Sequence, residues 1–87
     1  MPLHFPNASR IFDPARQCVT FWGHDSTFEI AFHVDAEVLH RFSPKAGHDE
    51  AASLQVFDVN RARIERVASG VYARRRQNFN RLSAADF

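Results

Sequence analysis

Thr27-Phe28-Glu29-Ile30-Ala31-Phe32-His33-Val34 is the stretch that decides the fold, because bulky apolar residues alternate along it with small or polar ones. In an extended chain, odd-numbered residues point to one side and even-numbered residues to the other. The even-numbered ones here are Phe28, Ile30, Phe32 and Val34. A period of two over eight residues predicts a β-strand with one buried face.

Two turns precede this strand and predict an antiparallel sheet. Asp13-Pro14-Ala15-Arg16 separates strand-like runs at residues 9–13 and 17–23, and both Pro and Asp favour a turn at these positions. A second turn, Gly23-His24-Asp25-Ser26, leads into the alternating strand. We therefore expect three or four antiparallel strands joined by hairpins.

The pattern then becomes helical. Asp35 is placed to cap a short helix over residues 36–42. A long helix over residues 49–76 is expected from an apolar stripe formed by Leu54, Phe57, Ile64, Ala68, Val71 and Tyr72. Because the stripe continues past Gly70, we expect the helix to run through this residue. It would then either bend there or carry its last arginines beyond the body of the domain.

These elements predict one α+β domain over residues 1–87, with a short and a long helix packed on one face of the sheet. Leu3 and Phe5 add a short edge strand. Ser83 and Asp86 have the spacing of a capping box, which predicts a docked terminal turn. A chain of 87 residues, 45% of them hydrophobic, builds one core and leaves little room for a large catalytic cleft.

The chain also resembles a family of short bacterial proteins known only as a domain of unknown function. The resemblance covers nearly the whole chain and implies a small α+β fold and a bacterial cytoplasmic protein. It supplies no catalytic or binding residues, and Gly70 stands where a better helix former is expected. The residues that carry it are Phe5-Pro6-Asn7, Val19-Thr20-Phe21-Trp22-Gly23-His24-Asp25, the helical positions Phe57, Asn60, Arg61, Ile64, Ala68 and Tyr72, and the closing Leu82-Ser83-Ala84-Ala85-Asp86-Phe87.

Several classes of protein are excluded by what the sequence lacks. Met-Pro-Leu-His-Phe-Pro at the N-terminus has neither the basic start nor the apolar run of a signal peptide. No stretch approaches the roughly 20 apolar residues that span a bilayer. Cys18 is the only cysteine, so we expect no internal disulfide, and its strand-like surroundings predict a small buried side chain. We expect a cytoplasmic protein without a membrane partner.

The net charge of +1 hides an asymmetry between the two ends of the chain. Residues 1–60 carry four basic and eight acidic side chains, whereas residues 61–87 carry seven arginines and only two acidic residues. Such an asymmetry can indicate a nucleic-acid or acidic partner. Alternatively, the two parts attract each other within one fold.

The arginines of the long helix form the strongest candidate feature of the sequence. Arg63, Arg66 and Arg74 lie opposite the apolar stripe on a helical wheel, and guanidinium groups bind phosphate well. The alternative is an ordinary solvated helix face, since the sequence has no helix-turn-helix signature and no aromatic stacking platform. The candidate contacts with nucleic acid or an acidic partner are Arg63, Arg66, Arg74, Arg75 and Arg76, and Arg81 would extend them.

Arg61 differs from these arginines because it lies inside the apolar stripe. A buried charge requires a partner, and Asp58, Glu65 and Glu29 are available. We expect a structural ion pair, and the alternative is an arginine that anchors an interface or a ligand.

A further candidate site is the sheet face turned away from the helices. Two helices cover only one face of a small sheet, and the other face then exposes a Trp among small and polar residues, as in an interface core. The candidate interface residues are Thr20, Trp22, Ala31 and His33, with Cys18 beside them. A homodimer through this face is one prediction. The alternative is that the N- or C-terminal segment folds over it.

Neither catalysis nor metal binding has a clear signature. His24, His33, His40 and His48 are not spaced as ligands on one element, so no metal or cofactor is expected. Ser26 and Ser43 have a histidine nearby in sequence, but this alone does not make a nucleophile–base pair. The leading hypothesis is a non-catalytic interaction or regulatory module with a homodimeric or unknown protein partner. Weak nucleic-acid binding is the second hypothesis, and a small enzyme or metal protein using His24, His33 or His48 is the third.

Overall fold

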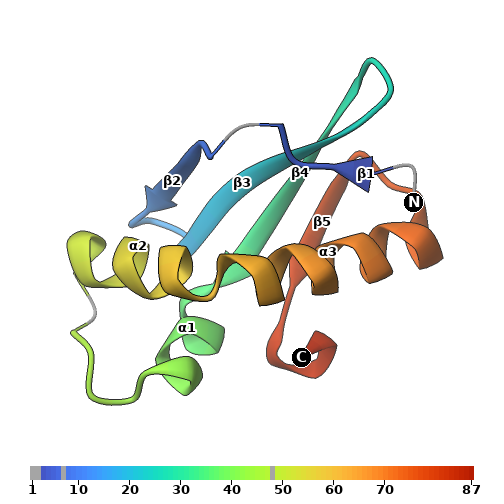
Figure 1. Ribbon diagram of the computed structural model, residues 1–87. Coiled ribbons are helices and arrows are strands. Elements are labelled where there is room, and N and C mark those ends of the chain that lie inside the picture. Colours follow the sequence, from blue (N-terminus) through green and yellow to red (C-terminus); the bar gives the residue numbers. More distant parts are fainter. Residues whose placement is uncertain (1–2, 7, 48) are drawn as a thin grey trace.

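The computed structural model describes residues 3–6, 8–47 and 49–87. The strands and helices follow one another in blocks: four strands come first, three helices follow, and one strand and a short turn end the chain (Figure 1). The elements are β1 (Leu3–His4), β2 (Arg10–Asp13), β3 (Cys18–Asp25), β4 (Phe28–Asp35), α1 (Ala36–Phe42), α2 (Glu50–Val59), α3 (Arg61–Arg75), β5 (Phe79–Leu82) and the 3-10 turn η1 (Ala84–Asp86).

The predicted α+β class is confirmed, and the sheet is larger than expected. It has five strands in the order β1-β3-β4-β5, and β2 pairs with β3 on the same edge as β1. The pairs among β1–β4 are antiparallel, as the hairpins predict, whereas β4 and β5 are parallel. A parallel neighbour requires a long crossover, and the three helices provide it.

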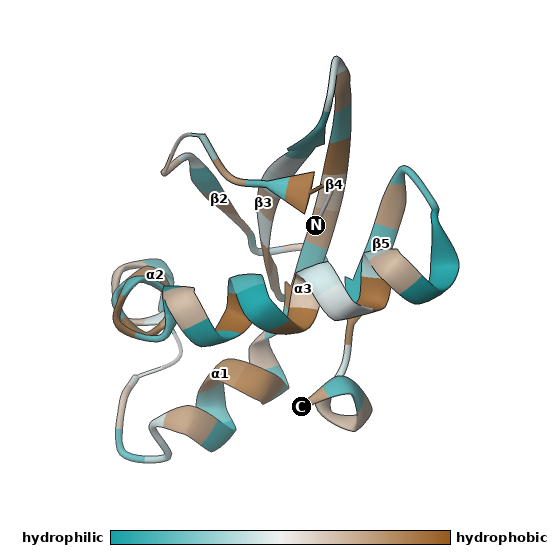
Figure 2. Cartoon of the chain, turned by 45° about the vertical axis from the view of Figure 1, so that its right-hand side comes forward, coloured by the Kyte–Doolittle hydropathy of each residue, from teal (hydrophilic) through white to brown (hydrophobic). Residues whose placement is uncertain are grey.

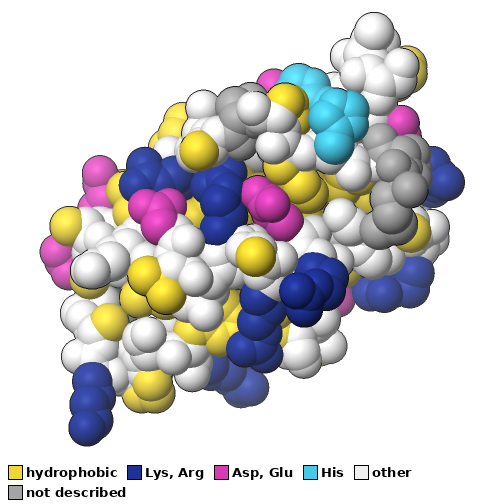
Figure 3. All heavy atoms as spheres, in the orientation of Figure 1, with side chains coloured by type: hydrophobic (Ala, Val, Ile, Leu, Met, Phe, Trp, Pro, Cys, Tyr) yellow, Lys and Arg dark blue, Asp and Glu magenta, His cyan; other side chains and the backbone are white. Residues whose placement is uncertain are grey.

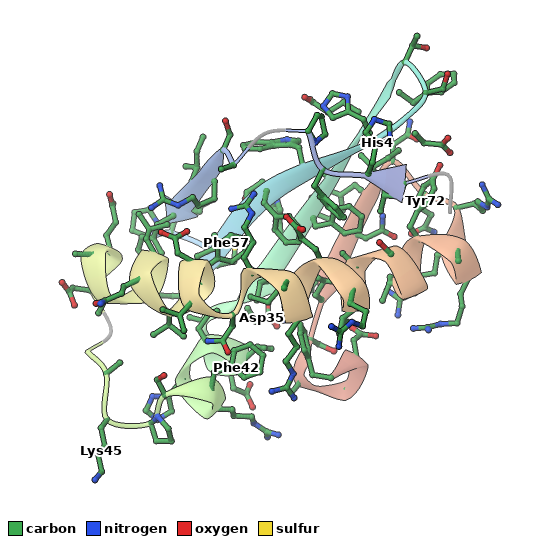
Figure 4. The ribbon with its side chains drawn as sticks, in the orientation of Figure 1. His4, Asp35, Phe42, Lys45, Phe57 and Tyr72 are labelled. Carbon is green, nitrogen blue, oxygen red and sulfur yellow. The ribbon has the colours of Figure 1, made fainter. Side chains whose placement is uncertain are left out.

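The inner face of the sheet packs against the helices. Phe21 and Phe32 stack with ring centroids 5.3 Å apart, and Phe57 of α2 lies 5.1 Å from Phe21. Figure 4 shows Phe57 on the side of α2 that faces the sheet. Ile64, Ala68, Val71 and Tyr72 of α3 are buried in the same core, as the apolar stripe predicts. The described helices therefore lie on one face of the sheet (Figures 1 and 2).

The first predicted turn is present, whereas the second lies two residues later than expected, because Gly23, His24 and Asp25 belong to β3. The main-chain N–H groups of Ala15 and Arg16 donate to the Asp13 carboxylate at 3.0 and 3.2 Å, which closes the first turn. In the second, Asp25 pairs directly with Phe28, so only two residues form the turn, and Ser26 adopts a left-handed φ of 57°. This geometry matches the right-handed twist of the flanking strands.

Phe28 is not part of the core, contrary to the alternation argument. Its side chain is 64% exposed, whereas Ile30, Phe32 and Val34 are fully buried. The β3–β4 hairpin extends beyond the helices (Figure 1). The start of β4 therefore has no helix to pack against, although the alternation assigns Phe28 to the same side of the strand as the core residues.

The expected long helix is broken at Asn60, and not at Gly70. Asn60 has φ −103° and ψ 15°, and its side-chain amide donates to the Val56 carbonyl at 2.8 Å. Asn competes in this way with main-chain hydrogen bonds and is a poor interior helix residue. Figure 2 shows α2 nearly end-on while α3 runs across the view, so the two helices are not coaxial. Gly70 lies within the regular α3, which ends at Arg75.

The last strand was not expected, although the terminal turn was. β5 pairs in parallel with Ala31–Val34 and leads into Ser83, whose main-chain N–H donates to the Asp86 carboxylate at 2.9 Å. The capping box is therefore confirmed. The predicted cap of α1 is only positional: Asp35 precedes the helix but makes no side-chain capping bond, because its carboxylate binds Arg81.

One ion pair and one hydrogen bond to the main chain tie the start of the chain to the helices. The guanidinium of Arg61 donates to Glu65 at 2.9 Å and to the Ala8 carbonyl at 3.2 Å, which confirms the predicted structural pair. Arg10 of β2 makes a two-pronged bond to Asp58 of α2, at 2.9 and 2.8 Å. The hydrogen bond from Arg10 lowers the pKa of the Asp58 carboxyl.

Replacing Gly70 with Ala should stabilise the protein. Gly70 has no positive φ, and a Cβ there would meet only the flexible end of Arg74, at 3.7 Å. Glycine inside a helix costs about 0.5–1 kcal/mol relative to Ala, so the free energy of unfolding in urea should rise by that amount. Gly23→Ala is the control, because its Cβ would lie 2.9 Å from Leu3 and Phe5, and it should lower the stability. A Gly70→Ala protein that is no more stable would contradict a regular helix at this position.

Candidate functional site: the open face of the sheet

The outer face of the sheet is built from the residues whose neighbours in the chain fill the core. The register places Ile11, Thr20, His33 and Arg81 in one row across β2, β3, β4 and β5. Trp22, Ala31 and Phe79 form the next row across β3, β4 and β5. We call the outer face the surface formed by Ile11, Thr20, Trp22, Ala31, His33 and Phe79.

No helix in the described part of the chain lies over the outer face, which points away from the viewer in Figure 1. Ile11 is 59% exposed and Phe79 is 51% exposed, and both are unusually accessible for large apolar residues. Of the terminal segments, neither residues 3–6 nor residues 84–87 cover the face. β2 and β5 extend its edges, and Phe87 packs on the helical side, with its ring 5.5 Å from that of Phe42.

Two hollows mark the outer face. The first, of about 610 Å³, is lined by Ser9, Arg10, Ile11, Trp22 and Glu29. The second, of about 390 Å³, is lined by Arg16, Cys18, His33, Asp35, Phe79 and Arg81. Both are open and shallow, and each combines an aromatic residue with charged groups. Such hollows fit side chains of another protein better than they enclose a small molecule.

The charged groups around the face are already paired. Arg81 makes a two-pronged bond to Asp35, with Nε and Nη2 at 3.0 and 2.8 Å from its oxygens, and this bond raises the pKa of Arg81. His24 and Glu29 are cross-strand neighbours, with Nε2 and Oε2 4.0 Å apart. The apolar centre is thus surrounded by polar groups, which is the arrangement of a protein interface.

Cys18 has the properties of a packing residue. Its side chain is buried, as predicted, and it lines the floor of the second hollow. Burial raises the pKa of the thiol, and the charge of Asp13 adds to the effect. The protonated thiol is a poor nucleophile.

The histidines are not gathered into a metal site. Within residues 3–6, 8–47 and 49–87, no group of three or more His, Cys, Asp or Glu side chains could hold a metal ion. His33 packs its ring against Phe79, at 4.4 Å and nearly perpendicular, and His24 lies beside Glu29. His48 lies outside the described residues.

The arginines do not form one continuous strip. Arg63, Arg66 and Arg74 are exposed on α3, as expected, but Arg63 stacks on the Phe42 ring at 4.6 Å. Arg81 does not extend them, because it lies on β5 at the second hollow. Figure 3 shows the Lys and Arg side chains of the helical side spread among acidic and apolar groups.

The charge asymmetry is partly explained by attraction within the fold. Arg76 lies 3.8 Å from Asp25, which also accepts a hydrogen bond from Tyr72, and the Arg81–Asp35 pair joins the two ends of the chain in the same way. Arg74 and Arg75 lie 3.9 and 3.5 Å from Asp86. Much of the basic charge therefore has acidic partners inside the molecule.

Sequence reasoning found four of the six outer-face residues and missed Ile11 and Phe79. Ile11 lies in a predicted strand opposite Thr20, and its alternation with Phe12 was the available signal. Phe79 had no such signal, because its segment was not recognised as a strand.

The fold and the site define a small α+β domain with an uncovered sheet face. The chain belongs to a family described as "Protein of unknown function (DUF1488)", whose pattern matches residues 3–82. No curated protein and no solved structure was found to match it. Among the described residues, no helix is both long and apolar enough to cross a membrane.

His33 should make the protein less stable in mild acid. Burial lowers the pKa of His33, and the Arg16 charge lowers it further, against the opposite influence of Asp13 and Asp35. Below its ordinary pKa of about 6.5, the unfolded chain takes up a proton that the folded chain does not. Stability should therefore fall as the pH drops through that value, until the folded pKa is passed. Urea unfolding of wild type and His33→Gln between pH 5 and pH 8 measures this, and an equal pH dependence in both proteins would contradict it.

Proposed function

We propose that the protein is a non-catalytic interaction module of the cytoplasm, which binds a protein partner through the outer face. One observation carries the proposal: Ile11, Trp22 and Phe79 stand exposed or half-buried on a sheet face that no described helix covers. Monomeric soluble proteins rarely leave such contiguous apolar surface in water, because its burial is favourable.

The chemistry of the face supports binding rather than catalysis. The thiol of Cys18 is buried and held in its protonated form. The guanidinium of Arg81 and the carboxylate of Asp35 satisfy each other in a two-pronged bond, so neither is poised for proton transfer. The apolar centre of the face provides affinity, and the paired charged groups around it orient the partner. A regulatory or scaffolding contact requires both.

Substituting the face should abolish partner binding. Ile11→Asp and Trp22→Asp place a charge within the proposed interface, at its edge and near its centre respectively, and affinity should fall at least about tenfold. The wild-type chain is used to capture proteins from its source cell. Those proteins that neither variant captures are then purified, and their affinity for the wild-type chain is measured by titration. The emission of Trp22, which is the only Trp, reports the contact directly.

Val59→Asp is the matched control. Val59 is 78% exposed on α2, on the other side of the molecule, so the same chemical change there should leave binding intact. Ile11 is itself 59% exposed, which makes Ile11→Asp tolerable for folding. Equal capture by wild type, Ile11→Asp and Trp22→Asp would refute the proposal.

Weak nucleic-acid binding is a second candidate, favoured by the shared exposed side of Arg63, Arg66 and Arg74 on α3. Phosphate contacts release counterions, so the affinity should fall steeply with salt, and replacing Arg74, Arg75 and Arg76 with Ala should flatten that slope. A mobility shift assay with duplex DNA and single-stranded RNA measures both. Absence of any shift at about 50 mM salt would eliminate this candidate.

A further inference from the structure

We infer that the partner of the outer face is a second copy of this chain, bound about a two-fold axis parallel to β3 and β4. The inference rests on the proposed function and names its partner. Two sheets pack face to face about 10 Å apart, with their strands within about 30° of each other. The strand register then determines which residues meet.

At the centre of the face, this axis brings unlike residues together. It places β3 over the partner's β4 and keeps each residue at its own level along the strands. Trp22 therefore meets the partner's Ala31, because Trp22 and Ala31 are register partners within one chain. Thr20 meets the partner's His33 for the same reason. A large ring lies against a small side chain and a hydroxyl against an imidazole, and each contact occurs twice, as a two-fold interface requires.

At the edges, a projection meets a hollow. Phe79 stands half-exposed on β5, at the level of Ala31 and Trp22. The first hollow lies at the same level on the opposite edge, where Ile11 and Trp22 line it. The rotation sets Phe79 over the partner's first hollow and the partner's Phe79 over the hollow of this chain. The outer face is thus complementary in shape to itself.

The pairing of polar groups favours this axis over the other two-fold axis in the plane of the sheet. With the axis along the strands, His24 faces the partner's Glu29, and Glu29 faces the partner's His24. With the axis across the strands and centred between Thr20 and Trp22, Glu29 would face the partner's Asp35. Both oxygens of Asp35 are already bound by Arg81 and offer Glu29 no donor, whereas the His24 imidazole can donate an N–H to the partner's Glu29.

The decisive measurement is an isotope-filtered NOE spectrum of a mixture of labelled and unlabelled chains. Within one chain, Ile11 and Phe79 are separated by β3 and β4. At about 4.8 Å per strand, this is about 14 Å, which is too far for an NOE. We expect NOEs from the Phe79 ring to Ile11 and Trp22 of the other copy. NOEs between the two Phe79 rings would instead indicate the axis across the strands and overturn the inference.

Sedimentation equilibrium supplies the energetic test. We expect a species of twice the 10.0 kDa chain mass, and Phe79→Ala should raise the dimer dissociation constant about tenfold or more. Phe28→Ala is the matched control, because Phe28 is 64% exposed at the hairpin tip and outside the outer face. A chain that stays monomeric up to about 1 mM, or a dimer that Phe79→Ala does not weaken, would overturn the inference.

Failure of this inference is distinguishable from failure of the proposed function. If the chain is monomeric and the Ile11→Asp variant no longer captures a protein that the wild type captures, self-association is refuted. The proposed interaction module then remains supported, with a different protein as its partner. A monomeric chain whose capture is unchanged by Ile11→Asp would refute both.

Discussion

The packing of Phe21, Phe32 and Phe57 is the interaction on which the rest of the structure depends. It joins the two central strands to α2 and fixes which side of the sheet is inside. Because side chains alternate along a strand, the choice that buries Phe21 also directs Thr20 and Trp22 outward. The helices that follow cover the inner face of the sheet, and the described chain has no further layer that covers the outer face. The open face is therefore a direct consequence of how the core is made.

Much of this architecture is encoded locally and can be predicted from the sequence. Alternation over residues 27–34 gives β4 and its buried side, and Asp13 and Pro14 give the first turn by fixing main-chain conformation. The ion pair of Arg61 with Glu65 follows from the position of a charge inside an apolar stripe. The exposure of Trp22 follows because the predicted helices can cover only one face of a small sheet. Each of these depends on residues that are close together in the chain.

The features that sequence reasoning missed depend on distant contacts or on competition between hydrogen bonds. β5 reverses the usual pattern, since Phe79 points outward and Asn80 is buried, with its amide donating to Gln77. Only its parallel partner β4 makes the segment a strand, and Ala31 is 48 residues away from Phe79 in sequence. The break between α2 and α3 arises because the Asn60 side chain takes a main-chain acceptor. A helical wheel shows which side of a helix is apolar, but it does not show where a side chain competes for a main-chain hydrogen bond.

The parallel pairing of β4 with β5 also sets the order in which the molecule can be completed. While the chain is being synthesised, β4 exists well before β5, because three helices lie between them. During that interval β4 presents unpaired N–H and C=O groups beside buried-type residues such as Ile30, Phe32 and Val34, which is the kind of edge that recruits other strands. Helices form much faster than distant strands pair, so α1–α3 can cover the inner side while the edge waits. The last strand of the sheet thus replaces the eight-residue edge of β4 with an edge of only four residues, and short edge strands recruit other strands less readily.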